Sequence, residues 1–243
     1  MSIPLFFTDF LPGKGAIVQL SDETARHVAG VLRMREGNVI RLTSGKGDIA
    51  HAVIVESTKK SCTVRVDKVE FAEQPSFRLC IAVSLLKNPA RFEWLLEKCA
   101  EIGVNTIQPL ICKRTEKQQF KKSRSESILK SAMQQSQQLW LTELPVPLGV
   151  ESFIKQSSLH YNKKYIAHCE PEQKFQLSEK LTSVSENDRI AILIGPEGDF
   201  SPDEIQLALQ NGFEPVALGN SRLRTETAAV VAAAVLMSAV WNK

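Results

Sequence analysis

The sequence lacks the motifs that mark several common classes of enzyme and metal-binding protein. No C-x-x-C pair occurs and the five cysteines are widely spaced, so we expect neither a structural nor a catalytic zinc site. The G-x-x-x-x-G-K-[ST] loop and the G-x-S-x-G elbow are both missing, which excludes P-loop nucleotide hydrolases and elbow-type serine hydrolases. The odd cysteine count, with several of these residues in apolar runs, indicates a reducing, cytoplasmic environment.

Long hydrophobic runs and a strong net charge are missing too. The first residues have no basic lead and only a short apolar run, so we expect no signal peptide. The alanine-rich run at 228–237 is too short for a membrane span, which needs about 20 residues. The net charge is only +3, but residues 113–130 hold seven Lys or Arg against two Glu. This segment suggests an anionic partner, with a solvated helix face as the alternative.

The sequence pattern changes near residues 70–77, which predicts a domain boundary between residues 72 and 73. Alternating segments at 39–43, 51–55 and 62–66, with one short helix beginning near Ser21 or Asp22, predict a small β-barrel in residues 1–72. Residues 73–243 alternate strand and helix patterns, which predicts an α/β domain with a mostly parallel sheet. We expect strands at 79–86, 106–110, 165–168, 190–194 and 213–218, and helices at 91–102, 126–139, between 168 and 190, from 202 onward and at 228–237.

Two glycine-bearing turns near the C-terminus each lead from a predicted strand into a helix. The first is Ile194-Gly195-Pro196-Glu197-Gly198, and Ser201 with Glu204 then forms a capping box that starts the next helix. The second turn spans residues 218–227. Taken singly, each turn could merely reverse the chain. We expect the two strands to be neighbours, so that their carboxyl ends form a crevice in which glycines let a ligand approach the backbone closely.

The pattern Gly45-x-Gly47-x-x-Ala50 matches the dinucleotide-binding fingerprint in its letters alone. It lies between two predicted strands, whereas the fingerprint requires a strand before it and a helix after it. We therefore interpret this pattern as the turn of a β-hairpin, in which glycine supplies the backbone conformation that a tight turn requires.

Arg224 and Glu226 flank Thr225 at the start of the last, apolar helix. Thr225 or Glu226 is expected to cap the helix, because oxygen atoms and carboxylates favour a helix N-terminus. A cation at that end is unfavourable unless an anion meets it. Arg224 therefore points either to an anionic substrate or to pairing with Glu226.

Residues 194–198, together with Leu218-Gly219-x-x-x-Leu223-Arg224-Thr225-Glu226-Thr227-Ala228, resemble the bacterial 16S ribosomal RNA (uracil-N3)-methyltransferases of the RsmE type, in the SPOUT superfamily. The resemblance covers nearly the whole chain. Its weaker marks are His27-x-x-x-Val31-Leu32-Arg33, Leu86-Lys87, Lys98-x-x-Glu101-Ile102-Gly103-Val104, Pro109, Arg114 and Gln135-Ser136. The chain departs from the family at Gln134 and Gln138, where charged residues are common, and at Ser221, where Arg is common and Arg222 follows instead.

The resemblance implies a PUA-like RNA-binding barrel in residues 1–72 and a SPOUT methyltransferase domain with a trefoil knot in residues 73–243. It further implies a homodimer that uses S-adenosylmethionine, without metal or membrane, to methylate N3 of a uridine in 16S ribosomal RNA, either naked or in the assembled small subunit. The apolar last helix would lie in the dimer interface. The implied cofactor-binding residues are Leu193, Ile194, Gly195, Pro196, Gly198, Leu218, Gly219, Asn220 and Leu223.

Methylation of uracil N3 requires loss of an imide proton, so such an enzyme must favour the uracil anion. Arg224 is predicted to stabilise the charge on the uracil oxygens, at about 3 kcal/mol for such a contact. Glu226 is the candidate base, unless it orients Arg224 or caps the helix. The predicted RNA phosphate contacts are Arg33, Arg35, Lys87, Arg91 and Arg114. Two alternatives are a non-catalytic RNA-binding or ribosome-assembly factor and an α/β enzyme that binds an anionic metabolite at the Gly195 turn.

Overall fold

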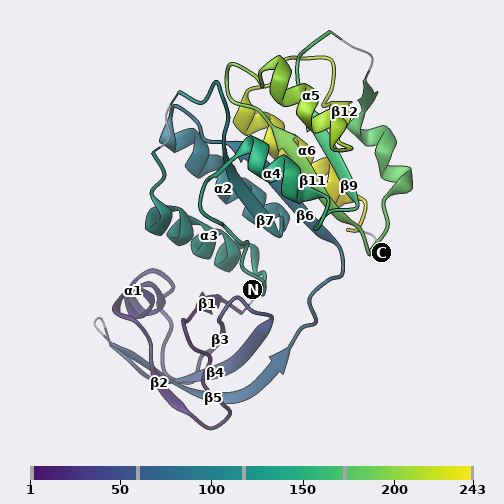
Figure 1. Cartoon of the computed structure of the whole chain (residues 1–243). Helices are drawn as coiled ribbons and strands as arrows, with labels where there is room; N and C mark the ends of the chain where they lie inside the picture. The colour runs from purple at the N-terminus through teal and green to yellow at the C-terminus, as the bar shows by residue number, and fades with distance from the viewer. Residues whose placement is uncertain (1–2, 59–60, 117–118, 172–173, 242–243) are drawn as a thin grey trace. The chain divides into compact units, whose positions relative to one another are not determined.

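The computed structural model describes residues 3–58, 61–116, 119–171 and 174–241. Lys117 and Gln118 of the basic segment 113–130 lie outside the described residues. The chain divides into two compact units, of which unit 1 comprises Met1–Gln74 and Met133–Leu141, and unit 2 comprises Pro75–Ala132 and Thr142–Lys243 (Figure 1). Among the described helices, none has the length and apolar character needed to cross a bilayer.

Unit 1 is built on a five-stranded sheet in the order β1-β3-β4-β5-β2. Its strands are β1 (Leu5–Phe7), β2 (Ile17–Gln19), β3 (Val39–Thr43), β4 (Asp48–Ser57) and β5 (Cys62–Phe71). Alternation along β4 and β5 places Ala52, Ile54, Val64 and Val66 in a buried core. The three strands predicted from alternation, β3 to β5, are confirmed. Strands β1 and β2 were missed because three residues are too few to establish a period of two.

The short helix of unit 1 begins where its cap predicts. Ser21 Oγ accepts a hydrogen bond from Thr24 N at 3.3 Å, and α1 (Asp22–Arg26) follows. The chain continues as a π-helical turn, η1 (His27–Val31), and Arg33 then adopts a positive φ of 52°. Residues 31–33 are exposed as a result. Because π-turns are costly and often occur at functional sites, this segment is a candidate contact surface.

The turn between β3 and β4 confirms the hairpin interpretation of Gly45 and Gly47, whose φ values are 75° and 87°. The segment 133–141 pairs with this turn within unit 1. Gly47 N donates to Leu139 O and Leu141 N donates to Gly45 O, both at 2.9 Å. A Cβ on Gly47 would lie 2.3 Å from Trp140 Cζ2. The absence of a side chain at Gly47 therefore lets a distant part of the chain pack on the sheet.

Unit 2 contains a seven-stranded sheet in the order β10-β12-β9-β11-β6-β7-β8. Its strands are β6 (Arg78–Ser84), β7 (Thr106–Ile111), β8 (Leu148–Gly149), β9 (Lys163–Ala167), β10 (Phe175–Gln176), β11 (Arg189–Ile194) and β12 (Glu214–Ala217). Every pairing between neighbours in this order is parallel. The predicted parallel α/β architecture is confirmed, and the two-residue strands β8 and β10 are additions that the sequence pattern did not indicate.

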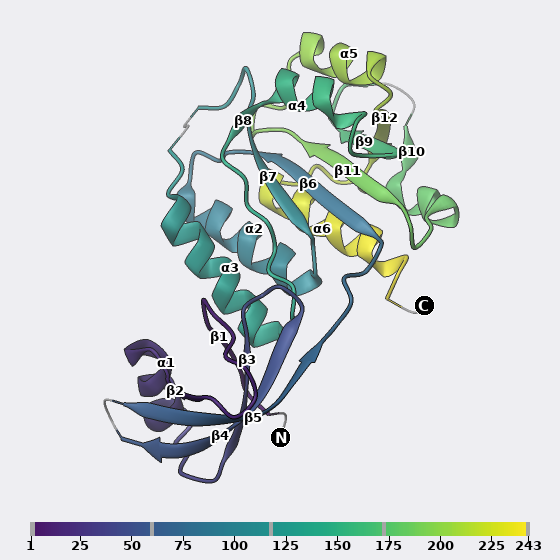
Figure 2. The ribbon, with the colours of Figure 1, turned by 60° about the horizontal axis from the view of Figure 1, so that its bottom comes forward.

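Helices cover both faces of this sheet. In Figure 2, α4 and α5 lie on one face and α2 and α6 on the other. Phe153 and Ile154 of α4 and Ile205 of α5 share one core cluster with Ala191 and Leu193 of β11. The described helices that follow α1 and η1 along the chain are α2 (Pro89–Ile102), α3 (Lys122–Ser136), α4 (Val150–Ser157), the 3-10 helix η2 (Leu177–Ser183), α5 (Pro202–Gln210) and α6 (Thr225–Ser238).

The helices differ from the prediction in extent, type and number. Helix α3 starts at Lys122 and ends at Ser136, before residue 139, because Gln137 adopts a positive φ of 62°. The helix expected between residues 168 and 190 is a 3-10 helix, and α4 was missed. Helix α5 begins as predicted, because Ser201 Oγ accepts from Glu204 N at 3.4 Å and the Glu204 carboxylate accepts from Ser201 N at 2.7 Å.

Most cysteines behave as small hydrophobic residues, as their apolar surroundings predict. Cys62, Cys80, Cys99 and Cys112 are buried with free thiols. Burial raises the pKa of the Cys80, Cys99 and Cys112 thiols to about 12, so these groups stay protonated at neutral pH. Cys169, in contrast, is exposed.

Candidate functional site

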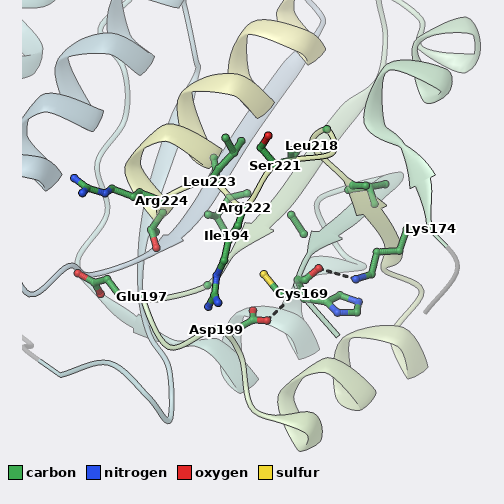
Figure 3. A pocket seen from close by; sticks show the side chains of 18 of the residues that line it. Cys169, Lys174, Ile194, Glu197, Asp199, Leu218, Ser221, Arg222, Leu223 and Arg224 are labelled. Carbon is green, nitrogen blue, oxygen red and sulfur yellow. Dashed lines mark hydrogen bonds between the residues drawn. The ribbon is translucent and has the colours of Figure 1, made fainter. Parts of the chain in front are cut away.

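A pocket of about 620 Å³ lies at the carboxyl ends of three strands of unit 2, β9, β11 and β12 (Figure 3). Its volume falls within the range of about 300–1,000 Å³ that is typical of small-molecule sites. The expectation that β11 and β12 are neighbours is wrong, because β9 lies between them and pairs with both. The loop after β9 therefore supplies a third wall, built from Ala167, His168 and Cys169, which the sequence did not indicate.

The pocket brings together most of the predicted cofactor residues. Those that line it are Ile194, Gly195, Pro196, Leu218, Gly219, Asn220 and Leu223. Leu193 instead is fully buried in the core, and Gly198 lies beside Arg114 outside the lining. The lining residues that the sequence did not predict as cofactor contacts are Ala167, His168, Cys169, Lys174, Glu197, Asp199, Val216, Ala217, Ser221, Arg222, Arg224, Thr225 and Ala228.

The first glycine turn is held by its own backbone and by Asp199. A Cβ on Gly195 would lie 3.1 Å from Phe200 N and from the ring of Phe200, which is fully buried and has no room to shift. Asp199 adopts a positive φ of 63°. Its Oδ1 accepts from Phe200 N and its Oδ2 from Cys169 N, both at 2.8 Å. Asp199 thus ties the β9 loop to the β11 turn and keeps a fixed negative charge in the pocket.

The second glycine turn leads directly into α6. Gly219 has a φ of 121°, which favours glycine, and space is open where its Cβ would stand. Arg224 occupies the N-cap position of α6, and no side-chain cap is formed there. Thr225 is the first residue of α6 and so does not occupy its N-cap, whereas Glu226 lies in the first turn, where a carboxylate is favourable.

Glu226 pairs with Arg91 of α2, although pairing with Arg224 was expected as one possibility. Its Oε1 lies 3.6 Å from Arg91 Nε, and its carboxyl side chain is only 9% exposed. Within the described residues, Glu226 Oε2 is buried without a hydrogen-bond partner. Glu226 is absent from the pocket lining, whereas Arg224 belongs to it. The two predicted catalytic residues are thus separated, and Arg91 is a partner that the sequence did not indicate.

Apart from Arg91, the predicted RNA contacts fall into two groups. Lys87 Nζ lies 2.6 Å from Glu116 Oε2, and this hydrogen bond raises the pKa of Lys87. Arg114 donates to Gly198 O at 2.8 Å and to Phe200 O at 3.2 Å, so it supports the first glycine turn. Arg33 and Arg35 of unit 1 are exposed, and their guanidinium groups have no partner among the described residues. These two remain available to an external anion.

The described part of the chain contains no group of three or more His, Cys, Asp or Glu residues that could hold a metal ion. What the pocket offers instead is open backbone at Gly219, two carboxylates, from Glu197 and Asp199, and two arginines, Arg222 and Arg224. This combination suits a zwitterionic small molecule, because backbone groups can form hydrogen bonds to it and the side chains present charges of both signs.

Known proteins of one family share this architecture. The chain is 30% identical over 231 residues to the ribosomal RNA small subunit methyltransferase E of Buchnera aphidicola, covering 90% of this chain and 87% of that protein. It also resembles the structure of that methyltransferase from Neisseria gonorrhoeae bound to S-adenosylmethionine, with a TM-score of 0.83, 27% identity and 98% of both chains covered. A Legionella pneumophila protein solved with the same cofactor gives a TM-score of 0.84, 29% identity and 98% coverage of both chains.

Two family models divide the chain in the same order as the sequence pattern. The model described as an RNA methyltransferase PUA domain matches residues 20–67, within unit 1. The model described as an RNA methyltransferase domain matches residues 72–237, which contain every residue that lines the pocket. The fold, the pocket and these matches agree: the chain belongs to the RNA methyltransferase family.

Proposed function

We propose that this protein transfers a methyl group from S-adenosylmethionine to N3 of a uridine in 16S ribosomal RNA of the small ribosomal subunit. The observation that carries the proposal is the pocket at the ends of β9, β11 and β12, which holds seven of the residues that the family resemblance implies for the cofactor. The names of the relatives, ribosomal RNA small subunit methyltransferase E, support the substrate. The proposed division of labour is an RNA-binding part in residues 1–72 and a methyltransferase part in residues 73–243.

The residues at the pocket fit the cofactor and supply the remaining catalytic requirements. When bound, S-adenosylmethionine supplies an electrophilic methyl group on its sulfonium. The backbone of the two glycine turns, which is open at Gly219, would hold it in place. Arg224, exposed at the pocket edge and free of any partner among the described residues, is proposed to stabilise charge on the uracil oxygens as the N3 proton leaves.

In catalysis, Glu226 was expected to act either as the base or as a residue that positions others. Its burial, its contact with Arg91 and its place outside the lining favour positioning, since a base must reach the proton that it removes. In that role Glu226 would hold Arg91 of α2 against the first turn of α6 and so fix the helix end from which Arg224 projects.

We further propose a homodimer with α6 in its interface, a trefoil knot in the methyltransferase part and a cytoplasmic location. Helix α6 buries Ala229, Ala232, Ala233 and Leu236 within unit 2. Its other side, with Val231, Ala234 and Val235, is only half-buried in the single chain. An apolar helix with one incompletely covered side supports contact with a second copy. The proposed reaction needs no metal and no membrane.

Binding to the RNA is expected to depend on Arg33 and Arg35. Removing both charges in an Arg33→Ala, Arg35→Ala variant should weaken binding to small subunits and reduce the slope of log K against log salt by about 1.4, at about 0.7 per contact to single-stranded RNA. Filter binding between 50 and 200 mM salt measures this slope. The matched control is Lys155→Ala, Arg189→Ala, which removes two exposed charges of unit 2. Equal slopes in both variants would remove Arg33 and Arg35 from the interface.

The proposed reaction is tested by mapping new methyl groups. The protein is incubated with S-adenosylmethionine and small ribosomal subunits from a strain that lacks it, in parallel with naked 16S ribosomal RNA, and RNA fragments are analysed by mass spectrometry. We expect one new methyl group at N3 of a uridine. Tight binding to the subunits without any methyl transfer would instead support the non-catalytic assembly factor. Binding of an anionic metabolite in place of S-adenosylmethionine would support the third alternative.

A further inference from the structure

Three cationic side chains, from Lys174, Arg222 and Arg224, line the pocket, and they are used differently. Lys174 Nζ is occupied, because it donates to His168 O and to Glu170 O, each at 2.6 Å. In Figure 3 the Arg224 side chain runs outward to the side, whereas the Arg222 side chain runs into the pocket in the direction of the turn that carries Asp199. Arg222 is therefore the cation that projects into the space a ligand would fill.

The Arg222 guanidinium has no hydrogen bond and no ion pair within the described residues. No ion pair joins it to Asp199, whose two carboxylate oxygens instead accept backbone hydrogen bonds from Phe200 N and Cys169 N. Glu197 Oε1 in turn accepts from Lys87 N at 3.2 Å. The pocket thus presents an unpaired guanidinium and two carboxylates that the backbone holds in place. Its ligand should carry at least one anionic and one cationic group.

The methyl donor has this charge pattern. At neutral pH, S-adenosylmethionine carries a carboxylate and an ammonium group at its amino acid end, and a positive sulfonium in the middle. We propose that Arg222 binds the carboxylate of the methyl donor, while the fixed charges of Asp199 and Glu197 favour its cationic groups. This inference rests on the proposed function and names the residue that recognises the amino acid end of the cofactor. It also gives a role to the arginine that stands one position after the place where the family commonly has one.

A phosphate of the RNA is the competing ligand for Arg222, since guanidinium groups bind both carboxylates and phosphates. The direction of the side chain decides between them. Arg222 is exposed, but its side chain runs into the pocket formed by the loops of β9, β11 and β12, whose volume of about 620 Å³ suits a small molecule, and this direction favours the carboxylate over an RNA phosphate. Arg224, which points outward, is better placed for the acceptor.

The test compares two ligands that differ at the amino acid end. S-adenosylmethionine carries the carboxylate, whereas 5′-methylthioadenosine lacks the whole amino acid end and, because its sulfur has only two substituents, the sulfonium charge. Dissociation constants are measured by titration calorimetry for the wild-type chain, Arg222→Gln and Arg222→Lys. Arg189→Gln is the control, because Arg189 is exposed at the start of β11 and lies outside the pocket lining.

We expect Arg222→Gln to weaken S-adenosylmethionine binding about tenfold, as for loss of one charge-assisted hydrogen bond, with 5′-methylthioadenosine changed less than about twofold. Arg222→Lys should recover part of the loss, and Arg189→Gln should behave as wild type. Unchanged affinity for S-adenosylmethionine in Arg222→Gln overturns the inference, and so does an equal loss for both ligands. A loss confined to small-subunit binding assigns Arg222 to the RNA instead. Failure of the wild-type chain to bind S-adenosylmethionine is a separate result that overturns the proposed function itself.

Discussion

An Arg224→Ala variant is expected to turn over about 100- to 1,000-fold more slowly than the wild-type protein, with affinity for S-adenosylmethionine changed less than about threefold. Arg224 stands at the N-cap of α6, where its charge is unfavourable beside the positive end of the helix. Its guanidinium has no hydrogen bond or ion pair among the described residues, so no direct partner there offsets that cost. A group that stabilises charge in the transition state should affect the rate much more than the binding of the donor.

Single-turnover kinetics on small subunits measures the effect on rate, and calorimetry with S-adenosylmethionine measures the effect on donor affinity. Arg224→Lys keeps the charge but lacks the planar pair of donors, so an intermediate rate is expected. Arg189→Ala is the control for removal of an exposed arginine from the same unit. A normal rate for Arg224→Ala would exclude Arg224 from the mechanism. A loss of donor affinity as large as the loss of rate would make it a cofactor-binding residue.

Gly47→Ala is expected to destabilise unit 1 by about 3 kcal/mol. Two separate effects contribute. The backbone of Gly47 has a φ of 87°, and a Cβ there would lie 2.3 Å from Trp140 Cζ2 and 2.7 Å from Ala72 O. Neither neighbour can move freely, because Ala72 O is backbone and the Trp140 ring packs edge-on against Phe71 at 5.9 Å. The substitution should therefore displace the segment 133–141 from the sheet of unit 1.

Chemical denaturation followed by tryptophan fluorescence measures this change in the free energy of unfolding. Gly37→Ala is a matched control, since Gly37 has nearly the same φ, 84°, but nothing lies within 4 Å of the position of its Cβ. That variant should lose only the stability that a positive φ costs an alanine, about 1 kcal/mol. If Gly47→Ala and Gly37→Ala lose equal stability, contact with Trp140 contributes nothing, and the proposed packing of 133–141 on the hairpin is wrong.

The segment 133–141 also explains one of the departures from the family pattern. Gln134 Oε1 accepts from Phe7 N at 2.9 Å, and Gln137 accepts from Arg41, both within unit 1. A neutral amide at residue 134 can form such a bond without burying a charge at the edge of the sheet. The departure at Gln134 is therefore accounted for by packing within unit 1. Arg222, in contrast, lies in the pocket, where the change affects ligand binding.

The sequence by itself determined the features that depend on neighbouring residues. The capping box at Ser201 and Glu204, the hairpin at Gly45 and Gly47, and the strands β3 to β7, β9, β11 and β12 all follow from interactions within a few positions along the chain. The two glycine turns belong to this group: their residue types indicated a ligand site, and residues of both turns line the pocket.

Only the tertiary structure decided which of these local elements meet. Strand β9 lies between β11 and β12, so the loop with His168 and Cys169 joins the pocket and Asp199 links two of its walls. Glu226 pairs with Arg91, about 135 positions away along the chain, and not with Arg224 beside it. Strand order and ion pairing between distant residues depend on which surfaces are buried together, and neither leaves a periodic pattern in the sequence. The sequence therefore indicated what the pocket is made of, and the fold determined which of its charges remain free to bind.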